Sequence, residues 1–361
     1  MVKRLLLIPA SIALLTGTIV TCQSGSAPNS APTRSYRLGF SATPPRLTIQ
    51  SVLQTIDAWR PYSDIAQITQ GVPWRALLAD TSAVLLVRRD LKDLAILYRS
   101  RGLPLIVQLD VTDGLARDRE APELVALGRS IAEPLVQQRY REYVAAVDSI
   151  LHPEYLGLAA ETNLVRAIAP PSVYAAVVTI AAGGENTLVA QSSTAKRFIS
   201  VQVETAWGRL PSVGHFVGIA ADRADFPYIT TLGLSSYPFL ASFANPSDVP
   251  VDYFARLNES SATKLPMLIV EGGWSSGSVT GVTSSPELQA LWIKREMELA
   301  DRGALVAVTQ IAFTDLDLST YTVPPGSILP LFAQLGLVDV NFNPKPALAE
   351  WARVFARPLS P

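Results

Sequence analysis

Short apolar runs alternate with longer segments of helical period from about residue 36 to the end of the chain. Alternating apolar and polar positions are typical of strands, and apolar spacings of three and four indicate amphipathic helices. Strands are predicted over 37–42, 65–69, 104–110, 155–161, 199–206, 231–237, 266–271 and 304–313. Helices are predicted over 47–59, 90–100, 133–151, 171–182, 251–262, 286–302, 327–335 and 346–355.

The regular succession of strand and helix favours a parallel sheet, and eight such units favour a closed barrel. A doubly wound open sheet is the alternative, but it usually carries a glycine-rich phosphate loop after its first strand. The segment "FSATPPR" at that place is no such loop. We therefore predict an α/β fold, a single-domain (β/α)8 TIM barrel over residues 36–361.

The alternation of side chains along each barrel strand predicts which residues reach the functional mouth at the carboxyl ends of the strands. In the seventh strand, Leu268 and Val270 are predicted to face the helices, whereas Met267, Ile269 and Glu271 face inward. Glu271 is then delivered to the mouth, unless a bulge changes the alternation.

Other strands deliver polar side chains to the same mouth. The alternation predicts Glu161 at the end of the fourth strand and Tyr237 at the end of the sixth. It also turns Asp110 and Gln202 inward, together with Glu204. Two glutamates across a barrel mouth suit glycosidic bond hydrolysis, which needs one carboxylic acid and one carboxylate. The carboxylate separation that distinguishes retention from inversion is not given by this pattern.

Composition removes several classes of function. Charged residues make up 17% of the 361 residues and the formal net charge is -1, which disfavours nucleic-acid binding. With two histidines and one cysteine, we expect no metal site of histidine and cysteine ligands and no cofactor, and calcium bound by carboxylates remains an alternative. A lyase that uses a Schiff-base lysine is also disfavoured on this barrel, because no lysine ends a predicted strand.

The N-terminus has the pattern of an export signal, with basic residues followed by an apolar stretch that ends in "IVTC". We predict a signal peptide with a lipobox over residues 1–22, with Cys22 as the lipidated residue, and a flexible linker over 23–35. The protein is then expected in the cell envelope of a bacterium as a lipoprotein held to the membrane through Cys22, or secreted. Ordinary secretion and an uncleaved anchor remain alternatives.

Three segments resemble the clan A glycoside hydrolases, which are retaining (β/α)8 enzymes: "YLGLAAETN", "LGLSSYPF" and "LIVEGGWSS". The last two are most similar to the family 53 endo-β-1,4-galactanases and their relatives. The resemblance implies that the protein is an O-glycoside hydrolase acting on a polysaccharide or oligosaccharide with retention. It also implies that Glu161 is the general acid/base, Glu271 the nucleophile and Tyr237 the residue that orients Glu271.

One departure from the clan affects the expected activity. The acid/base of the clan usually follows an asparagine that binds the sugar 2-hydroxyl, and this chain has Ala160 there. Asn163 is a candidate replacement for that contact. The departure keeps a second hypothesis open, a catalytically impaired barrel lipoprotein that binds glycans without cleaving them.

Further side chains are candidates for contact with a carbohydrate partner. Trp74, Trp207 and Trp274 follow predicted strands, where indole rings commonly stack on sugars, although buried packing is the alternative. Asp110 and Glu204 could bind substrate or form structural ion pairs, and His215 lies in a long segment on the mouth side. We expect a monomer that binds carbohydrate and no nucleic acid.

Overall fold

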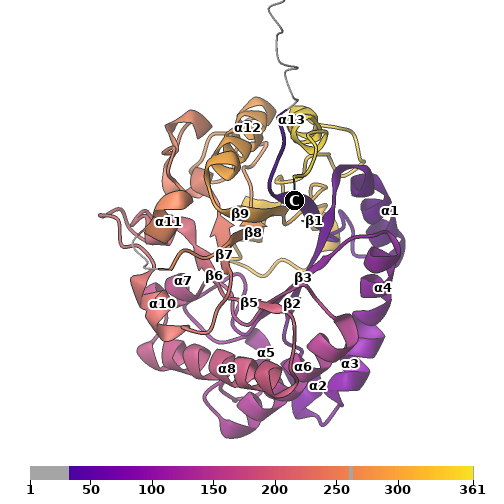
Figure 1. Cartoon of the computed structure of the whole chain (residues 1–361), viewed down its shortest axis with the longest axis vertical. Helices are drawn as coiled ribbons and strands as arrows, with labels where there is room; N and C mark the ends of the chain where they lie inside the picture. The colour runs from indigo at the N-terminus through magenta and orange to yellow at the C-terminus, as the bar shows by residue number, and fades with distance from the viewer. Residues whose placement is uncertain (1–31, 260–262, 361) are drawn as a thin grey trace, which may run out of the picture. The chain divides into compact units, whose positions relative to one another are not determined.

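The computed structural model describes residues 32–259 and 263–360, and in this part of the chain nine parallel strands form one sheet. The strands are β1 (Arg37–Ser41), β2 (Ile65–Gly71), β3 (Leu105–Asp110), β4 (Tyr155–Gly157), β5 (Lys196–Phe198), β6 (Ser200–Gln202), β7 (Leu232–Ser236), β8 (Met267–Gly272) and β9 (Leu305–Gln310). Their order is β5-β4-β3-β2-β1-β9-β8-β7-β6. The first and last strands of the chain are therefore neighbours, as Figure 1 shows.

The two ends of this order are joined by a single residue. Ile199 alone separates β5, which pairs with β4, from β6, which pairs with β7. Together β5 and β6 act as one interrupted strand, so the sheet is an eight-stranded barrel. The predicted (β/α)8 TIM barrel is confirmed.

Helices surround the strands on the outside of the barrel (Figure 1). They are α1 (Ile49–Trp59), α2 (Trp74–Leu78), α3 (Ala83–Asp90), α4 (Lys92–Ser100), α5 (Pro122–Ala126), α6 (Pro134–Leu151), α7 (Thr162–Ile168), α8 (Pro171–Ala190), α9 (Val203–Ala206), α10 (Ala220–Asp225), α11 (Ala255–Glu259), α12 (Pro286–Arg302) and α13 (Pro346–Phe355). By length and composition α8 could cross a membrane, but here it packs against α6 as a barrel helix.

The predicted elements differ from the observed ones mainly after the fourth and fifth barrel strands. The strand expected over 155–161 ends at Gly157, and Glu161 caps α7. The strand expected over 199–206 ends at Gln202, because the Gln202 side chain accepts a hydrogen bond from the Thr205 N–H and starts α9. The helix expected over 327–335 is only a 3-10 turn, η5 (Leu329–Phe332).

The barrel interior is filled by a separate cluster of apolar side chains: Ile65, Ile106, Tyr155, Phe198, Leu268, Val270 and Ala307. Leu268 and Val270 therefore point inward, and the orientation predicted for the seventh strand is wrong. A bulge explains why Glu271 still reaches the mouth. The register with β7 shifts at Ser235, which pairs with Glu271 and not with Val270.

Two glycines make room for an aromatic ring of the interior, that of Phe198. A Cβ atom on Gly157 would lie 2.5 Å from the Phe198 ring, and one on Gly233 would lie 2.8 Å from it. Both glycines are in strands that flank β5 and β6. The Phe198 ring is therefore packed directly against the backbone of the two neighbouring strands.

At the N-terminal end, the predicted signal peptide and Cys22 lie outside the described residues, as does most of the linker. Arg34 forms an ion pair with Asp64 at 2.6 Å and a bridge with Leu359. These contacts attach the chain to the barrel two residues before the predicted start at Tyr36.

We predict that Gly157→Ala lowers the free energy of unfolding by about 1–3 kcal/mol, the usual range for overpacking a filled core. Chemical denaturation followed by circular dichroism measures the change. Gly71→Ala is the matched control, because a Cβ atom at this strand residue meets no atom within 4 Å. Equal stability of the two variants would contradict the close packing of Phe198.

Candidate active site

A cavity of about 490 Å³ opens at the carboxyl ends of the strands. Five polar side chains form its floor: Asp110, Glu161, Gln202, Tyr237 and Glu271. They come from β3, the start of α7, β6, the residue after β7, and β8. The barrel thus gathers at one place residues that are spread over more than 160 positions of the sequence.

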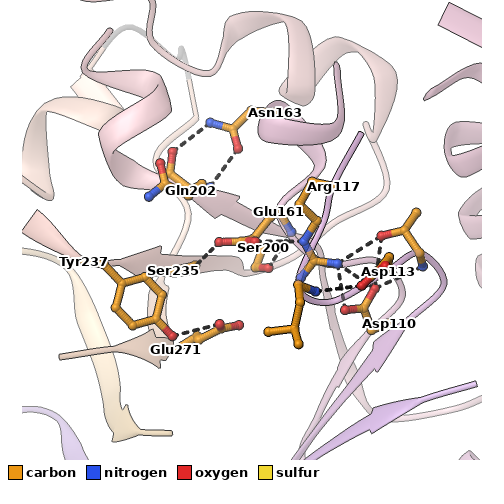
Figure 2. A network of polar contacts seen from close by, with 12 residues as sticks. Asp110, Asp113, Arg117, Glu161, Asn163, Ser200, Gln202, Ser235, Tyr237 and Glu271 are labelled. Carbon is orange, nitrogen blue, oxygen red and sulfur yellow. Dashed lines mark hydrogen bonds and ion pairs between the residues drawn. The ribbon is translucent and has the colours of Figure 1, made fainter. Parts of the chain in front are cut away.

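Glu161 is held in a strained backbone conformation between three hydrogen-bonding partners. Its φ of 46° and ψ of 45° are left-handed, which is uncommon for a residue other than glycine and is concentrated at functional sites. Its N–H donates to the Ser200 Oγ at 2.9 Å, and its Oε1 accepts from the Ser235 Oγ at 2.6 Å. The Arg117 Nε donates to Oε2 at 2.8 Å. Figure 2 shows Glu161 between these side chains.

Arg117 links Glu161 to a second carboxylate. Its Nη1 donates to the two oxygens of Asp110 at 2.8 and 2.7 Å, and to the Thr112 Oγ1 at 2.9 Å. All four of these residues are buried. An arginine keeps its charge in a protein, so one buried cation serves two carboxylates. Asp110 lies in the cavity as predicted, but its oxygens are occupied by this ion pair.

Glu271 lies at the end of β8 with Tyr237 as its hydrogen-bond donor. The Tyr237 hydroxyl donates to the Glu271 Oε1 at 2.8 Å (Figure 2). Burial, and then the negative charge of Glu161, raise the pKa of Glu271 to about 8. Arg117 and the Tyr237 hydrogen bond oppose this rise. With a pKa of about 8, Glu271 is mostly protonated at neutral pH.

Two glycines after Glu271 keep the chain close to the neighbouring strand. A Cβ atom on Gly272 would lie 2.6 Å from the Ser236 carbonyl oxygen. Gly273 has a φ of 142°, a conformation that suits only glycine. The sequence "EGG" thus allows β8 to end against β7 with the Glu271 side chain free to face the cavity.

Glu204 lies below the floor and does not line the cavity. Its Oε1 accepts hydrogen bonds from the hydroxyls of Ser236 and Tyr253, both at 2.8 Å, and its Oε2 accepts from the Gln202 amide. Burial raises the pKa of Glu204. It thus supports Gln202 and the end of β7, and the structure does not place it among residues that could touch a substrate.

Asn163 does not take the place of the missing asparagine. Its Nδ2 donates to the Gln202 carbonyl oxygen at 2.8 Å, and its Oδ1 accepts from the Gln202 N–H at 2.7 Å. Figure 2 shows the Asn163 amide directed at the backbone of Gln202. Its amide therefore ties α7 to β6. His215 is exposed and lines a separate pocket of about 240 Å³ with Asn163.

The three tryptophans expected at the cavity wall lie elsewhere. Trp274 is 1% exposed, packs against Trp292 and donates its indole N–H to the Ser284 Oγ at 2.9 Å. Trp74 is equally buried, in α2. Trp207 stacks on Tyr253, with ring centroids 5.1 Å apart. Each ring has its faces occupied by protein, so none is placed to stack on a sugar in this cavity.

The sequence pattern missed Arg117 and the two serines that hold Glu161. Arg117 lies in an irregular segment after β3, where side-chain orientation follows no period. The sequence gave only a weak indication of its role, namely an arginine seven residues after Asp110, which was predicted to face inward. The pattern assigned no role to Ser235, which lies two residues before Tyr237. Among the described residues, no three His, Cys, Asp or Glu side chains are grouped as metal ligands.

No protein-family model matches the chain, and no curated protein is similar to it in sequence. Solved structures are similar in fold. The exo-β-1,4-mannosidase Op5Man5 from Opitutaceae bacterium strain TAV5 has a TM-score of 0.66 at 15% identity, over 90% of this chain and 59% of that one. A GH5_18 protein from Streptomyces cattleya in complex with Manb1-4GlcNAc has a TM-score of 0.64 at 16% identity, over 90% and 81%.

Xylanase 10B from Thermotoga maritima has a TM-score of 0.59 at 14% identity, over 89% of this chain and 95% of that one. The chain thus spans about three fifths of the mannosidase and nearly all of the xylanase. At these identities the similarity establishes the barrel fold alone. These neighbours agree with the glycoside hydrolase resemblance in general and do not single out the family 53 galactanases.

We predict that Glu271 titrates with a pKa of about 8 in the folded protein. In Tyr237→Phe its pKa rises further, because the variant loses a hydrogen bond to the charged form. Carbon NMR of protein labelled at the glutamate side-chain carboxyls measures both values.

Two other glutamates complicate the assignment, because burial raises the pKa of Glu204 as well as that of Glu296. Burial raises the pKa of Glu296 on α12 to about 8, and this group lies outside the cavity with Gln310 as its donor at 2.7 Å. Spectra of Glu204→Gln, Glu271→Gln and Glu296→Gln separate the three signals. Titration of the Glu271 carboxyl between pH 4 and 5 would contradict the electrostatics described here.

Proposed function

We propose that the protein is an exported O-glycoside hydrolase that cleaves glycosidic bonds with retention, Glu161 acting as acid/base and Glu271 as nucleophile. The single observation that carries the proposal is the pair of cavity glutamates, which interact strongly enough for the charge of one to raise the pKa of the other. Glycoside hydrolysis requires one carboxylic acid and one carboxylate, and two interacting carboxyls in one cavity can supply both forms.

In the proposed first step, Glu161 gives its proton to the leaving oxygen while the Glu271 carboxylate attacks the anomeric carbon. The glycosidic C–O bond breaks and an ester to Glu271 forms. In the second step Glu161 takes a proton from water, which attacks the same carbon and releases Glu271. The tyrosine hydroxyl of Tyr237 orients the attacking carboxylate through its 2.8 Å hydrogen bond.

Arg117 sets a condition on this mechanism. The reaction needs a proton on Glu161, but the ion pair between Arg117 and Glu161 favours protonation of Glu271 instead. Because Arg117 also makes two hydrogen bonds to Asp110, it keeps a carboxylate partner when Glu161 becomes protonated. Asp110 is therefore proposed to let Glu161 change its charge without leaving a buried cation unpaired.

A catalytically impaired glycan-binding protein is the second candidate. Two observations favour it. Ala160 stands in place of the asparagine expected before the acid/base, and the ion pair with Arg117 occupies the Glu161 carboxylate. Tight binding of a sugar ligand without any product after long incubation would support this alternative. The proposed membrane anchor at Cys22 and the location in a bacterial cell envelope rest on residues 1–22 of the sequence alone.

We expect Glu271→Gln to lower kcat/KM for an activated aryl glycoside by more than about 1,000-fold, because the variant has no nucleophile. Glu161→Gln should slow glycosides with poor leaving groups by about 100-fold to 10,000-fold, since only these need strong protonation. A panel of 4-nitrophenyl and methyl glycosides provides the measurement.

Glu142→Gln, an exposed glutamate on α6 outside the cavity, is the control for loss of a carboxylate. It should hydrolyse every substrate at the wild-type rate. Wild-type rates in Glu161→Gln and Glu271→Gln would refute the proposed function.

A further inference from the structure

Around the two glutamates, the cavity is lined mainly by apolar side chains, and the polar exceptions outside the floor are Thr43, Thr69, Asp118 and Tyr321. On one side Leu164 and Ile168 extend from α7, and Leu210 extends from the segment after α9. All three are half-buried, so part of each side chain faces the open cavity. This wall offers apolar surface and no hydrogen-bonding side chain.

A second part of the wall has the same character. It is formed by Leu240 of the 3-10 turn η2 (Pro238–Ala241) and by Leu329 and Phe332 of η5. At the rim, Ile328 is 41% exposed and Leu115 is 37% exposed. Segments that follow five different strands thus contribute apolar groups to one lining. The helix predicted over 327–335 does not form. The turn in its place puts Leu329 and Phe332 on the wall, which the sequence pattern did not indicate.

The polar groups at the floor of the cavity already use most of their hydrogen-bonding capacity, and the Tyr321 hydroxyl donates to the Pro44 carbonyl oxygen. Asp110 and Arg117 bind each other. The Gln202 side-chain oxygen accepts from the Thr205 N–H, and its amide donates to Glu204. A second sugar above the floor would lose water from its hydroxyls without finding partners, which is unfavourable.

We propose that the group on the leaving side of the scissile bond is a hydrocarbon and not another sugar. This inference rests on the proposed hydrolysis at the same site. The substrate is a glycoside with one sugar at the polar floor and an apolar aglycone, a linear alkyl chain or a fused ring system, between the aliphatic walls. A cavity of about 490 Å³ lies within the range of about 300–1,000 Å³ that is typical of sites for single small molecules.

The experiment measures kcat/KM for methyl, butyl, hexyl and octyl glycosides of glucose, galactose and mannose, each below its micelle concentration. For the sugar that is accepted, kcat/KM should rise with each added methylene by up to about fourfold, the value for full burial of one CH₂ group. Ile328→Asn and Leu240→Asn should each reduce this rise, because each puts an amide on the wall.

Leu291→Asn is the matched control, a leucine on α12 that is 46% exposed and lies outside the cavity. It should leave the dependence on chain length as in the wild type. A steroidal glycoside of the same sugar distinguishes a fused ring system from a linear chain as the better aglycone. Equal kcat/KM for methyl and octyl glycosides, or faster cleavage of the matching disaccharide than of either, would overturn the inference.

Binding to the Glu271→Gln protein separates this inference from the proposed function. Calorimetric titration with the same glycosides should show affinity that rises with chain length. If no glycoside is hydrolysed but this rise is found, the proposed hydrolysis fails and the assignment of an apolar ligand group stands. If hydrolysis occurs but neither kcat/KM nor affinity depends on chain length, the apolar aglycone is refuted and the hydrolase stands.

Discussion

The ion pair between Arg117 and Glu161 is the interaction on which the arrangement of the site depends. A buried arginine needs buried carboxylates, and here Asp110 and Glu161 supply them from two different parts of the barrel. The negative charge left on Glu161 then acts together with burial to raise the pKa of Glu271. The burial of Arg117, Asp110 and Glu161 strengthens each of these effects. Loss of the arginine would leave two buried carboxylates without a cation.

The barrel could be predicted from the sequence because its strands and helices have different periods, and the pattern repeats eight times. Glu271 was also predicted at the mouth, but from an alternation that the structure reverses. Leu268 and Val270 point into the barrel, and the bulge opposite Ser235 returns Glu271 to the cavity. The alternation of side chains identifies the strand and its end. It does not reveal the extra residue of a bulge, and this residue reverses the direction of the side chains that follow it.

The rest of the site could not be predicted because it depends on irregular segments and on contacts between distant parts of the chain. Arg117 has no periodic context, and the leucines of the walls follow several different strands. The tryptophans were placed by their sequence position after strands, and the structure buries Trp74 and Trp274 in the packing between helices and barrel. Asn163 was chosen for its type, and its amide is used by the backbone of Gln202.

The central claim is that Glu271 is the attacking carboxylate and Glu161 the proton donor, although Arg117 pairs with Glu161. Incubation with an activated 2-deoxy-2-fluoro glycoside of an accepted sugar slows the second step and traps the covalent intermediate. Mass spectrometry of the digested protein then locates the sugar. The account predicts one adduct, on the peptide that contains Glu271. An adduct on Glu161 would reverse the two roles, and turnover without any adduct would contradict the covalent mechanism.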